Sequence, residues 1–146
     1  MSAPIIREAG SDEVEAITSL AHNGNPAPIA DYMTKRMESS VVRSVAVVDA
    51  KLIGFAGLDY SFYGNGFIPI LFVAPAARRS GVGTLLMRSV VRGCTTSKVF
   101  TSTNESNVPM RFLLAREGFE LSGIINNLDA GDPEVVYFRR IGASAN

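Results

Sequence analysis

The sequence predicts an α/β domain (α+β in some classifications) in which a mixed sheet carries helices on both faces. Helix-like and strand-like patterns alternate along the chain with turn residues between them. Some strand patterns follow one another through short turns, which makes part of the sheet antiparallel. The chain has 146 residues, of which 47% are hydrophobic. This length and composition fit a single domain over residues 1–146 with one substantial core.

The first quarter of the chain is predicted to form a strand and two helices. Residues 5–7 have the pattern of a short strand. Ser11 can cap the next helix through its hydroxyl, and acidic residues follow it in the first turn. Asn-Gly-Asn-Pro at residues 23–26 ends that helix. A second amphipathic helix follows, with apolar positions at Ile29, Tyr32, Met33 and Met37.

A three-strand meander is expected next. Residues 41–48 alternate loosely, and a tight turn at residues 49–51 joins them to residues 52–58 as a hairpin. After a glycine-rich turn at residues 63–66, residues 67–73 are apolar on both faces. This pattern predicts a strand buried in the middle of the sheet.

The second half of the chain is expected to alternate helices and strands. Pro109 suits the first turn of a helix, and Gly118 suits its end, where Phe119 can close a Schellman-type contact. The expected elements are a helix from Val82 to Val90, a strand at 99–102, a helix at 107–117 and strands at 121–128 and 135–141.

The segment between the central strand and its helix has the features of a phosphate-binding turn. The strand pattern stops at Pro75, a pair of arginines follows at Arg78 and Arg79, and Gly81 and Gly83 precede the helix. This order gathers backbone N–H groups, a helix N-terminus and positive charge around one point. A phosphate group is the natural ligand of such a turn.

Two common nucleotide-binding loops do not fit this segment. A P-loop requires Lys followed by Ser or Thr after its second glycine, but Gly83 is followed by Thr84 and Leu85. A dinucleotide-binding loop requires a third glycine three residues after Gly83, where this chain has Leu86.

The whole string Val-x-Pro-x-x-Arg-x-x-Gly-x-Gly-x-x-Leu, residues 73–86, resembles the acetyl-CoA-binding motif of the GNAT superfamily of N-acyltransferases. The order of the expected elements is also similar to that of the family over nearly the whole chain. The resemblance implies a GNAT-like, mainly antiparallel mixed sheet, and a strand before the turn that pairs with the pantetheine arm. The residues implied in cofactor binding are Leu71, Phe72, Val73, Arg78, Arg79, Ser80, Gly81, Val82, Gly83 and Thr84.

A second segment looks like the other GNAT signature. Asn107 opens a helix, Met110 follows three residues later, and Gly118-Phe119 closes the segment. The resemblance implies that Asn107 and Met110 also contact the cofactor. Leu114 departs from the family, which often has at this position a Tyr that can protonate the leaving thiolate.

The acceptor amine needs a group that removes a proton, and the sequence offers three leading candidates, besides Tyr60 next to the central strand. Glu105 is the first choice, because residues at strand ends beside the cofactor arm face the substrate. Tyr63 and Asp59, beside the central strand, are the others. Residues 67–70 lack the Glu that often serves as base in the family. A water molecule could also take the proton, since positioning alone provides much of the acceleration.

These features predict an acetyl-CoA-dependent N-acetyltransferase. The acetyl group would pass to a primary amine by direct attack in a ternary complex, without a covalent enzyme adduct. The alternative is a catalytically silent CoA-binding sensor or regulatory module, and a third reading is an interaction domain with a purely structural glycine turn. Cys94 is the one cysteine, and we expect it to be a small buried residue rather than a nucleophile.

Charge and composition limit the partners. Basic and acidic residues balance at 14 each, so we expect neither nucleic acid nor membrane as partner. The expected acceptor is a small-molecule or peptide amine. One cysteine excludes a multi-cysteine metal site, and no metal is expected. The N-terminus lacks the apolar core of a signal peptide, which favours a cytoplasmic location. Exposed strand edges would allow a homodimer.

Overall fold

The structure is a computed structural model that describes residues 2–23 and 42–142. The helix expected around residues 29–37 lies outside the described residues. The chain divides into two compact units, and each unit is built from two segments of the chain. The first comprises Met1–Leu58 and Pro69–Gly93, and the second Asp59–Ile68 and Cys94–Asn146. The single domain expected over residues 1–146 stays a prediction.

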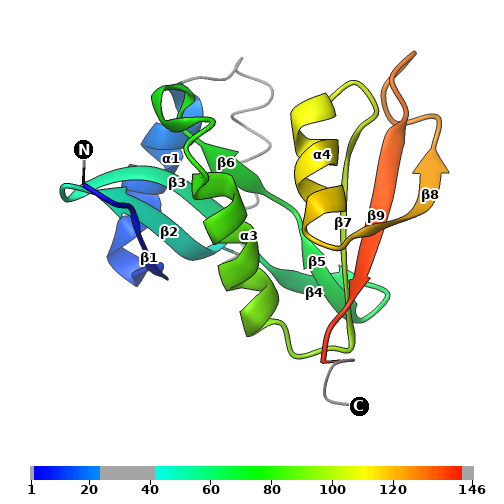
Figure 1. The fold of residues 1–146 in the computed structure, drawn as a ribbon, viewed down its shortest axis with the longest axis horizontal. Helices are drawn as coiled ribbons and strands as arrows, with labels where there is room; N and C mark the ends of the chain where they lie inside the picture. Colours follow the sequence, from blue (N-terminus) through cyan, green and yellow to red (C-terminus); the bar gives the residue numbers. More distant parts are fainter. Residues whose placement is uncertain (1, 24–41, 143–146) are drawn as a thin grey trace. The chain divides into compact units, whose positions relative to one another are not determined.

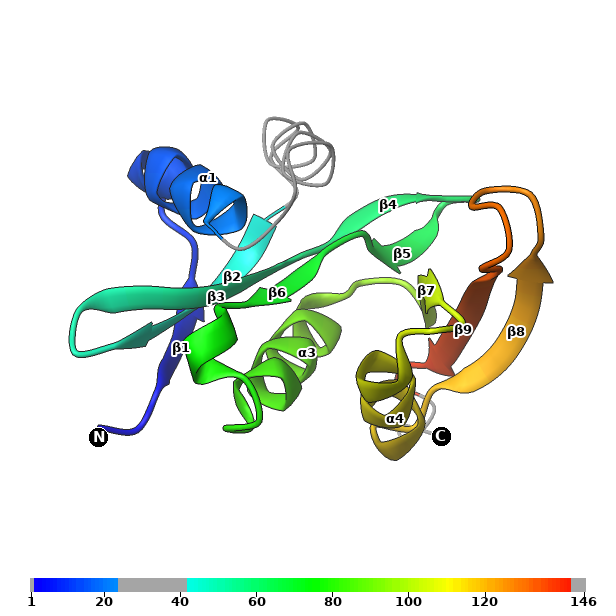
Figure 2. The ribbon, with the colours of Figure 1, turned by 90° about the horizontal axis from the view of Figure 1, so that it is seen from above.

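The first unit is an antiparallel sheet with a helix on each face (Figures 1 and 2). The strand order is β1-β2-β3-β6, so β6 lies at one edge. α1 and α3 pack on opposite faces of β3, as Figure 2 shows. Short 3-10 turns precede α1, at Ser11–Glu13, and α3, at Pro75–Ala77. The elements are β1 (Ile5–Glu8), α1 (Val14–His22), β2 (Val42–Val48), β3 (Lys51–Gly57), β6 (Leu71–Val73) and α3 (Val82–Gly93).

Large apolar side chains fill the space between this sheet and α1. Ile17 and Ala21 of α1 pack on Val45, Phe55 and Phe72 of the strands, and all five are buried. The rings of Phe55 and Phe72 lie 5.5 Å apart between centroids. The residues between this face of the sheet and α1 thus form one apolar core of the first unit.

Small residues line the opposite face, where α3 packs. A β-carbon on Gly54 would stand 2.8 Å from the carbonyl oxygen of Phe72 and 3.1 Å from Cδ1 of Leu86 in α3. Ser44 and Ser89 join their hydroxyls at 2.8 Å across the same interface. The absence of a side chain at Gly54 thus lets α3 pack closely on β3 and leaves room for the backbone of the neighbouring strand β6.

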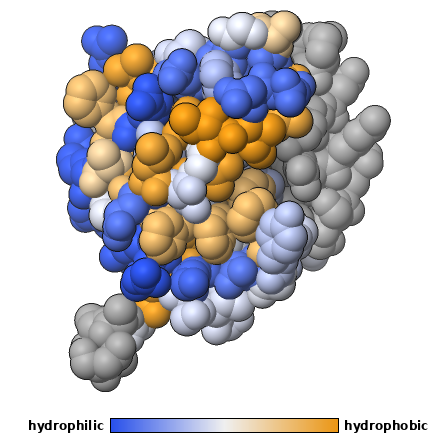
Figure 3. All heavy atoms as spheres, turned by 90° about the vertical axis from the view of Figure 1, so that its right-hand side faces the viewer, coloured by the Kyte–Doolittle hydropathy of each residue, from blue (hydrophilic) through white to orange (hydrophobic). Residues whose placement is uncertain are grey.

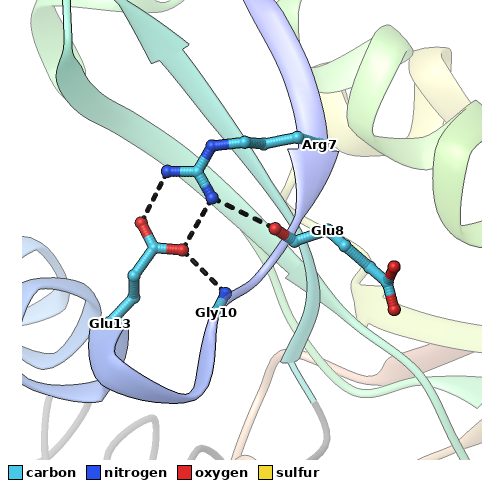
Figure 4. Close-up of polar contacts among 4 residues, drawn as sticks. All are labelled: Arg7, Glu8, Gly10 and Glu13. Carbon is cyan, nitrogen blue, oxygen red and sulfur yellow. Dashed lines mark hydrogen bonds and ion pairs between the residues drawn. The ribbon is translucent and has the colours of Figure 1, made fainter.

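The start of α1 corrects one sequence prediction (Figure 4). Gly10, not Ser11, precedes the helical turn, and the Glu13 carboxylate reaches back to accept its N–H at 2.8 Å. Arg7 donates two bonds of 2.7 Å to the same carboxylate and a third to the carbonyl of Glu8. The hydrogen bonds from Arg7 and then Gly10 lower the pKa of Glu13 to about 2. A longer acidic side chain thus replaces the predicted hydroxyl cap.

The second unit is a mixed sheet with α4 on one face (Figures 1 and 2). The strand order is β4-β5-β7-β9-β8, with β5 and β7 parallel and the other pairs antiparallel. Gly118 has φ +86° directly after α4, and Phe119 donates to the carbonyl of Leu114 at 2.9 Å, which confirms the predicted Schellman-type end. The elements are β4 (Asp59–Phe62), β5 (Asn65–Ile68), β7 (Lys98–Asn104), α4 (Val108–Arg116), β8 (Glu120–Ile125) and β9 (Glu134–Arg140).

The strand predicted over residues 67–73 is wrong as a single element. The segment splits into β5 and β6, which belong to different sheets, and Pro69 stands between them. Proline lacks the N–H that a strand residue donates, so pairing is interrupted here. β4 was not predicted, since it follows β3 almost without a turn signal. Among the described residues, no helix is long and apolar enough to cross a membrane.

Candidate functional site

The turn between β6 and α3 has the backbone conformation of an anion-binding nest. Arg79 and Gly81 both adopt left-handed conformations, with φ of +65° and +87°. The Ser80 hydroxyl between them donates to the carbonyl of Ala77 and fixes the turn. Alternation of left-handed and right-handed residues turns successive N–H groups toward one concavity.

The N–H groups of this turn are available to a ligand. Those of Gly81, Val82 and Gly83 donate to no residue in the described part of the chain. An added β-carbon on Gly81 would meet no atom within 4 Å, and one on Gly83 only Cγ2 of Val73, at 3.9 Å. Open space thus lies beside N–H groups at the positive end of a helix, as bound phosphate requires.

Arg78 holds the turn against β6. Its Nε donates to the carbonyl of Val73 at 3.0 Å, and its guanidinium lies 5.8 Å from the centroid of the Phe72 ring. The terminal nitrogens of Arg78 donate to no described residue, so one face of the group can still attract an anion. Arg79 is exposed beside it. The expected pair of cations is present, with Arg78 also serving as a clamp.

The free edge of β6 can accept an extended ligand. Ala74 donates to β3 at 2.8 Å and Ile70 accepts from β3 at 3.0 Å, so alternation turns Phe72 toward β3 as well. The N–H and C=O groups of Leu71 and Val73 therefore face away from β3, at the edge of this sheet. Leu71 and Val73 fit the predicted pairing with pantetheine amides. The side chain of Phe72 lies in the core, and its backbone groups face β3.

Asn107 and Met110 lie in the second unit, at the start of α4. The Asn107 Oδ1 accepts the Met110 N–H at 3.3 Å and caps the helix. Its side-chain nitrogen has no partner among the described residues. Asn107 thus combines a capping role with a free amide donor on the exposed surface.

Asp59, one of the three candidate bases, lies at the start of β4. Its Oδ1 accepts the N–H and the hydroxyl of Ser61, at 3.0 and 2.7 Å. Its Oδ2 accepts from no described residue and stays available to a cation. Asp59 pairs with Phe67 across the sheet and is partly exposed. Ser61 therefore orients the Asp59 carboxylate, and one of its oxygens can still accept a hydrogen bond.

The structure does not gather the three candidates into one cluster. Tyr63 occupies the β4–β5 turn with φ +54° and is 90% exposed. Glu105 follows β7, and its exposed carboxylate has no hydrogen bond within the described chain. It lies two strands and five residues from Asp59, about 19 Å by standard strand dimensions. These residues are alternatives rather than partners.

The position that often holds a catalytic Tyr in this family is part of the core. Leu114 is fully buried in α4. The nearby buried hydroxyl of Tyr137, in the strand expected at 135–141, accepts a hydrogen bond from Nε of Arg111 at 3.0 Å. This hydrogen bond raises the pKa of Arg111. The alternation of residues in β9 indicates that Tyr137 points inward, but it does not identify Arg111 of α4 as the partner.

Cys94 is buried, as predicted, and its sulfur lies 3.3 Å from the hydroxyl of Thr96. Over the described residues, no three His, Cys, Asp or Glu side chains are grouped so that they could hold a metal ion.

Comparison with known proteins identifies the family of the chain and supports its fold. The model of the acetyltransferase (GNAT) family matches residues 12–119, which include both segments described above. The chain belongs to the GNAT acetyltransferase family. It is therefore an acetyltransferase enzyme, and the general reaction of the family uses acetyl-CoA as acetyl donor. No curated protein sequence gives a significant match.

Solved structures of GNAT proteins share the fold over nearly their whole length. A GNAT-family acetyltransferase from Bacillus cereus ATCC 10987 is 28% identical with a TM-score of 0.82, and the match covers 96% of this chain and 99% of the other. The ribosomal-protein-S18-alanine N-acetyltransferase from Escherichia coli is 15% identical (TM-score 0.78; coverage 95% and 94%). Ard1 from Thermoplasma volcanium is 18% identical (TM-score 0.75; coverage 96% and 99%). At these last two identities the likeness concerns the fold alone.

Proposed function

We propose that this GNAT enzyme transfers the acetyl group of acetyl-CoA directly to a primary amine within a ternary complex. The proposal that acetyl-CoA is the donor rests on the turn before α3. There, the N–H groups of Gly81, Val82 and Gly83 lack a described partner, and open space adjoins both glycines. A pyrophosphate has the charge and the acceptor oxygens that these groups need.

The residues that would hold acetyl-CoA serve different parts of it. The turn of residues 79–84 would bind the pyrophosphate, and Arg78 would add charge from its terminal nitrogens. Leu71 and Val73 would hydrogen-bond the pantetheine amides along the free edge of β6. Asn107 would contact the same arm through its free side-chain nitrogen, with Met110 beside it.

Three events complete the transfer. The amine nitrogen forms a bond to the acetyl carbon, the bond from that carbon to sulfur breaks, and the proton lost by the amine is balanced by one gained at the thiolate. We propose that a backbone N–H of Leu71 or Val73 donates to the acetyl oxygen, because these groups face away from β3 whereas that of Phe72 faces it. Leu114 has no proton to give to the thiolate, and we propose that water supplies it.

Asp59 is the residue we propose to receive the ammonium form of the acceptor and to remove its proton, since Ser61 orients one oxygen and leaves the other available. Glu105 and Tyr63 remain the alternatives. The acceptor is proposed to be a small-molecule or peptide amine. Cys94, a buried free thiol, suits a reducing cytoplasm, which is the location we propose.

We also propose that the exposed edge of β8 is the surface through which two copies associate. Figure 3 shows apolar side chains gathered on this side of the second unit. The exposed residues of β8 and the turn after it are Leu121, Ile124, Ile125 and Leu128, which are 41 to 62% accessible. A long apolar edge strand is a template for pairing with another chain. Sedimentation should then show a dimer that Ile124→Lys converts to monomer.

Initial rates test the proposed reaction. Thiol release is measured while acetyl-CoA and a panel of primary amines are varied together, and each product is identified by mass. Reciprocal plots that intersect are expected for a ternary complex, and parallel plots would indicate a covalent enzyme intermediate instead. Binding of acetyl-CoA with no amine-dependent thiol release would favour the silent sensor. Asp59→Asn and Glu105→Gln then separate the candidate bases by their effect on kcat.

A further inference from the structure

Four phenylalanines form a continuous row on one face of the second unit. Phe67 of β5, Phe100 of β7 and Phe138 of β9 are direct cross-strand partners, and Phe62 of β4 lies over the first two. The ring centroids are 5.5 Å apart for Phe62–Phe67, 4.8 Å for Phe62–Phe100 and 5.9 Å for Phe100–Phe138. We call these four residues the phenylalanine row.

The row lies on the face of the sheet that α4 does not cover. Thr101 pairs with Tyr137, whose hydroxyl bonds Arg111 of α4, so these residues point to the helix. Phe100 and Phe138 are the next residues in their strands and point to the opposite face. Thr101 and Tyr137 are 2% and 6% exposed, whereas all four rings of the row remain partly exposed. Partly exposed aromatic rings that lie side by side form a contiguous apolar patch, and such patches mark binding surfaces.

Charged groups stand at both ends of the row. Asp59 is the direct cross-strand partner of Phe67, so the register places the proposed ammonium-binding carboxylate at the start of the row. The guanidinium of Arg140 lies 5.2 Å from the ring centroid of Phe138 and covers the other end. A cationic amine is therefore attracted to the Asp59 end and repelled at the Arg140 end. This arrangement gives a bound amine one preferred direction.

We propose that the phenylalanine row binds the carbon skeleton of the acceptor, and that the acceptor is a primary amine with an aromatic ring attached through a short chain. Its ammonium group pairs with Oδ2 of Asp59, and its ring stacks on Phe67, Phe62 and Phe100. Neighbouring strands are about 4.8 Å apart, so Asp59 and Phe67 are separated by about the width of one ring. A short chain between the ammonium group and the ring of the acceptor spans this separation. Offset stacking of rings at such separations is favourable beyond the burial of apolar area.

The inference that the bound amine is an acceptor rests on the proposed function, whereas the binding of the amine can be tested without any reaction. Binding of 2-phenylethylamine and of n-propylamine is measured by calorimetry with CoA present, which requires no turnover. Burial of a phenyl ring predicts that 2-phenylethylamine binds at least about tenfold more tightly. Asp59→Asn should weaken both amines, because each loses its ion pair.

Two matched variants locate the binding surface. Phe100→Leu keeps an apolar side chain but removes the central ring, and should reduce the preference for the phenyl amine severalfold. Phe112→Leu is the control, because Phe112 lies on α4 and is 71% exposed. It should leave the preference unchanged. Melting temperatures of both variants check that the fold is retained, and Phe62→Leu repeats the test if Phe100→Leu is unstable.

Three results would overturn the inference. Equal binding of the two amines to the unmodified protein would remove the aromatic preference. A preference that survives in Phe100→Leu and Phe62→Leu would place the ring elsewhere. A monomer-to-dimer equilibrium that shifts with Phe100→Leu, without any change in amine binding, would mean that a second copy covers the row. Failure of the proposed function looks different: the phenyl amine binds as expected, yet no acetyl group is transferred.

Discussion

Replacement of Gly83 by alanine should separate folding from cofactor binding. Gly83 lies in the first turn of α3, its φ is not positive, and its added β-carbon would contact only Val73, at 3.9 Å. The fold therefore accepts alanine without strain. Alanine is favoured over glycine inside a helix by up to about 1 kcal/mol and by less at a helix end. The melting temperature of ligand-free Gly83→Ala should stay the same or rise slightly.

Acetyl-CoA binding should respond in the opposite direction. If pyrophosphate oxygens approach the backbone at Gly83, the new methyl group holds them away from the N–H groups. A hydrogen bond to a charged group is worth roughly 1.5–3 kcal/mol, which corresponds to about a 10- to 150-fold weaker Kd. Titration calorimetry with acetyl-CoA measures this loss.

Gly93 supplies the matched control. It ends the same helix, and an added β-carbon there would meet no atom within 4 Å. Gly93→Ala should have the same small effect on the melting temperature and should bind acetyl-CoA like the unmodified protein. Unchanged affinity in Gly83→Ala would show that the phosphate does not lie at this turn. A melting temperature lowered by several degrees would show that the local geometry is wrong.

Two further substitutions test the fold of the first unit. Gly54→Ala places a methyl group 2.8 Å from the backbone oxygen of Phe72 and should destabilise the protein by about 1–3 kcal/mol, which urea unfolding detects; wild-type stability would refute this close approach. Glu13 pairs with Arg7 and has its pKa lowered to about 2, below its ordinary 4.5, so its contribution to stability is present above pH 4.5 and fades as pH falls toward 2. Glu13→Gln should therefore lower the urea midpoint at pH 6 more than at pH 3, while Glu15→Gln in the exposed part of α1 should show no such difference; equal losses at both pH values would contradict the pairing.

Local signals predicted the elements that local interactions determine. Pro109 lies in the first turn of α4 and Gly118 follows its end, as expected, because each acts through its own backbone conformation. The turn at residues 79–84 was predictable for the same reason. Ser11 failed as a cap because the competing group, the Glu13 carboxylate, gains a second partner in Arg7 from the preceding strand. Such a partner is not visible in the pattern of the helix itself.

Long-range pairing explains what the sequence could not predict. The apolar run from Phe67 to Val73 has the same character throughout, yet its halves pair with different strands on either side of Pro69. The phenylalanine row is likewise a product of register, since its members come from four strands. Asp59 was a candidate by its place in the chain, and only the register puts it beside an aromatic surface.

The fate of the acetyl group tests the central claim most directly. Acetyl-CoA labelled with carbon-13 at the carbonyl is mixed with the protein and 2-phenylethylamine, and the label is followed by NMR. The proposed function, together with the inferred aromatic acceptor, predicts that the thioester resonance is replaced by an amide resonance at a rate that depends on both substrates. A thioester resonance that persists while the protein binds CoA would contradict acetyl transfer to this class of amine.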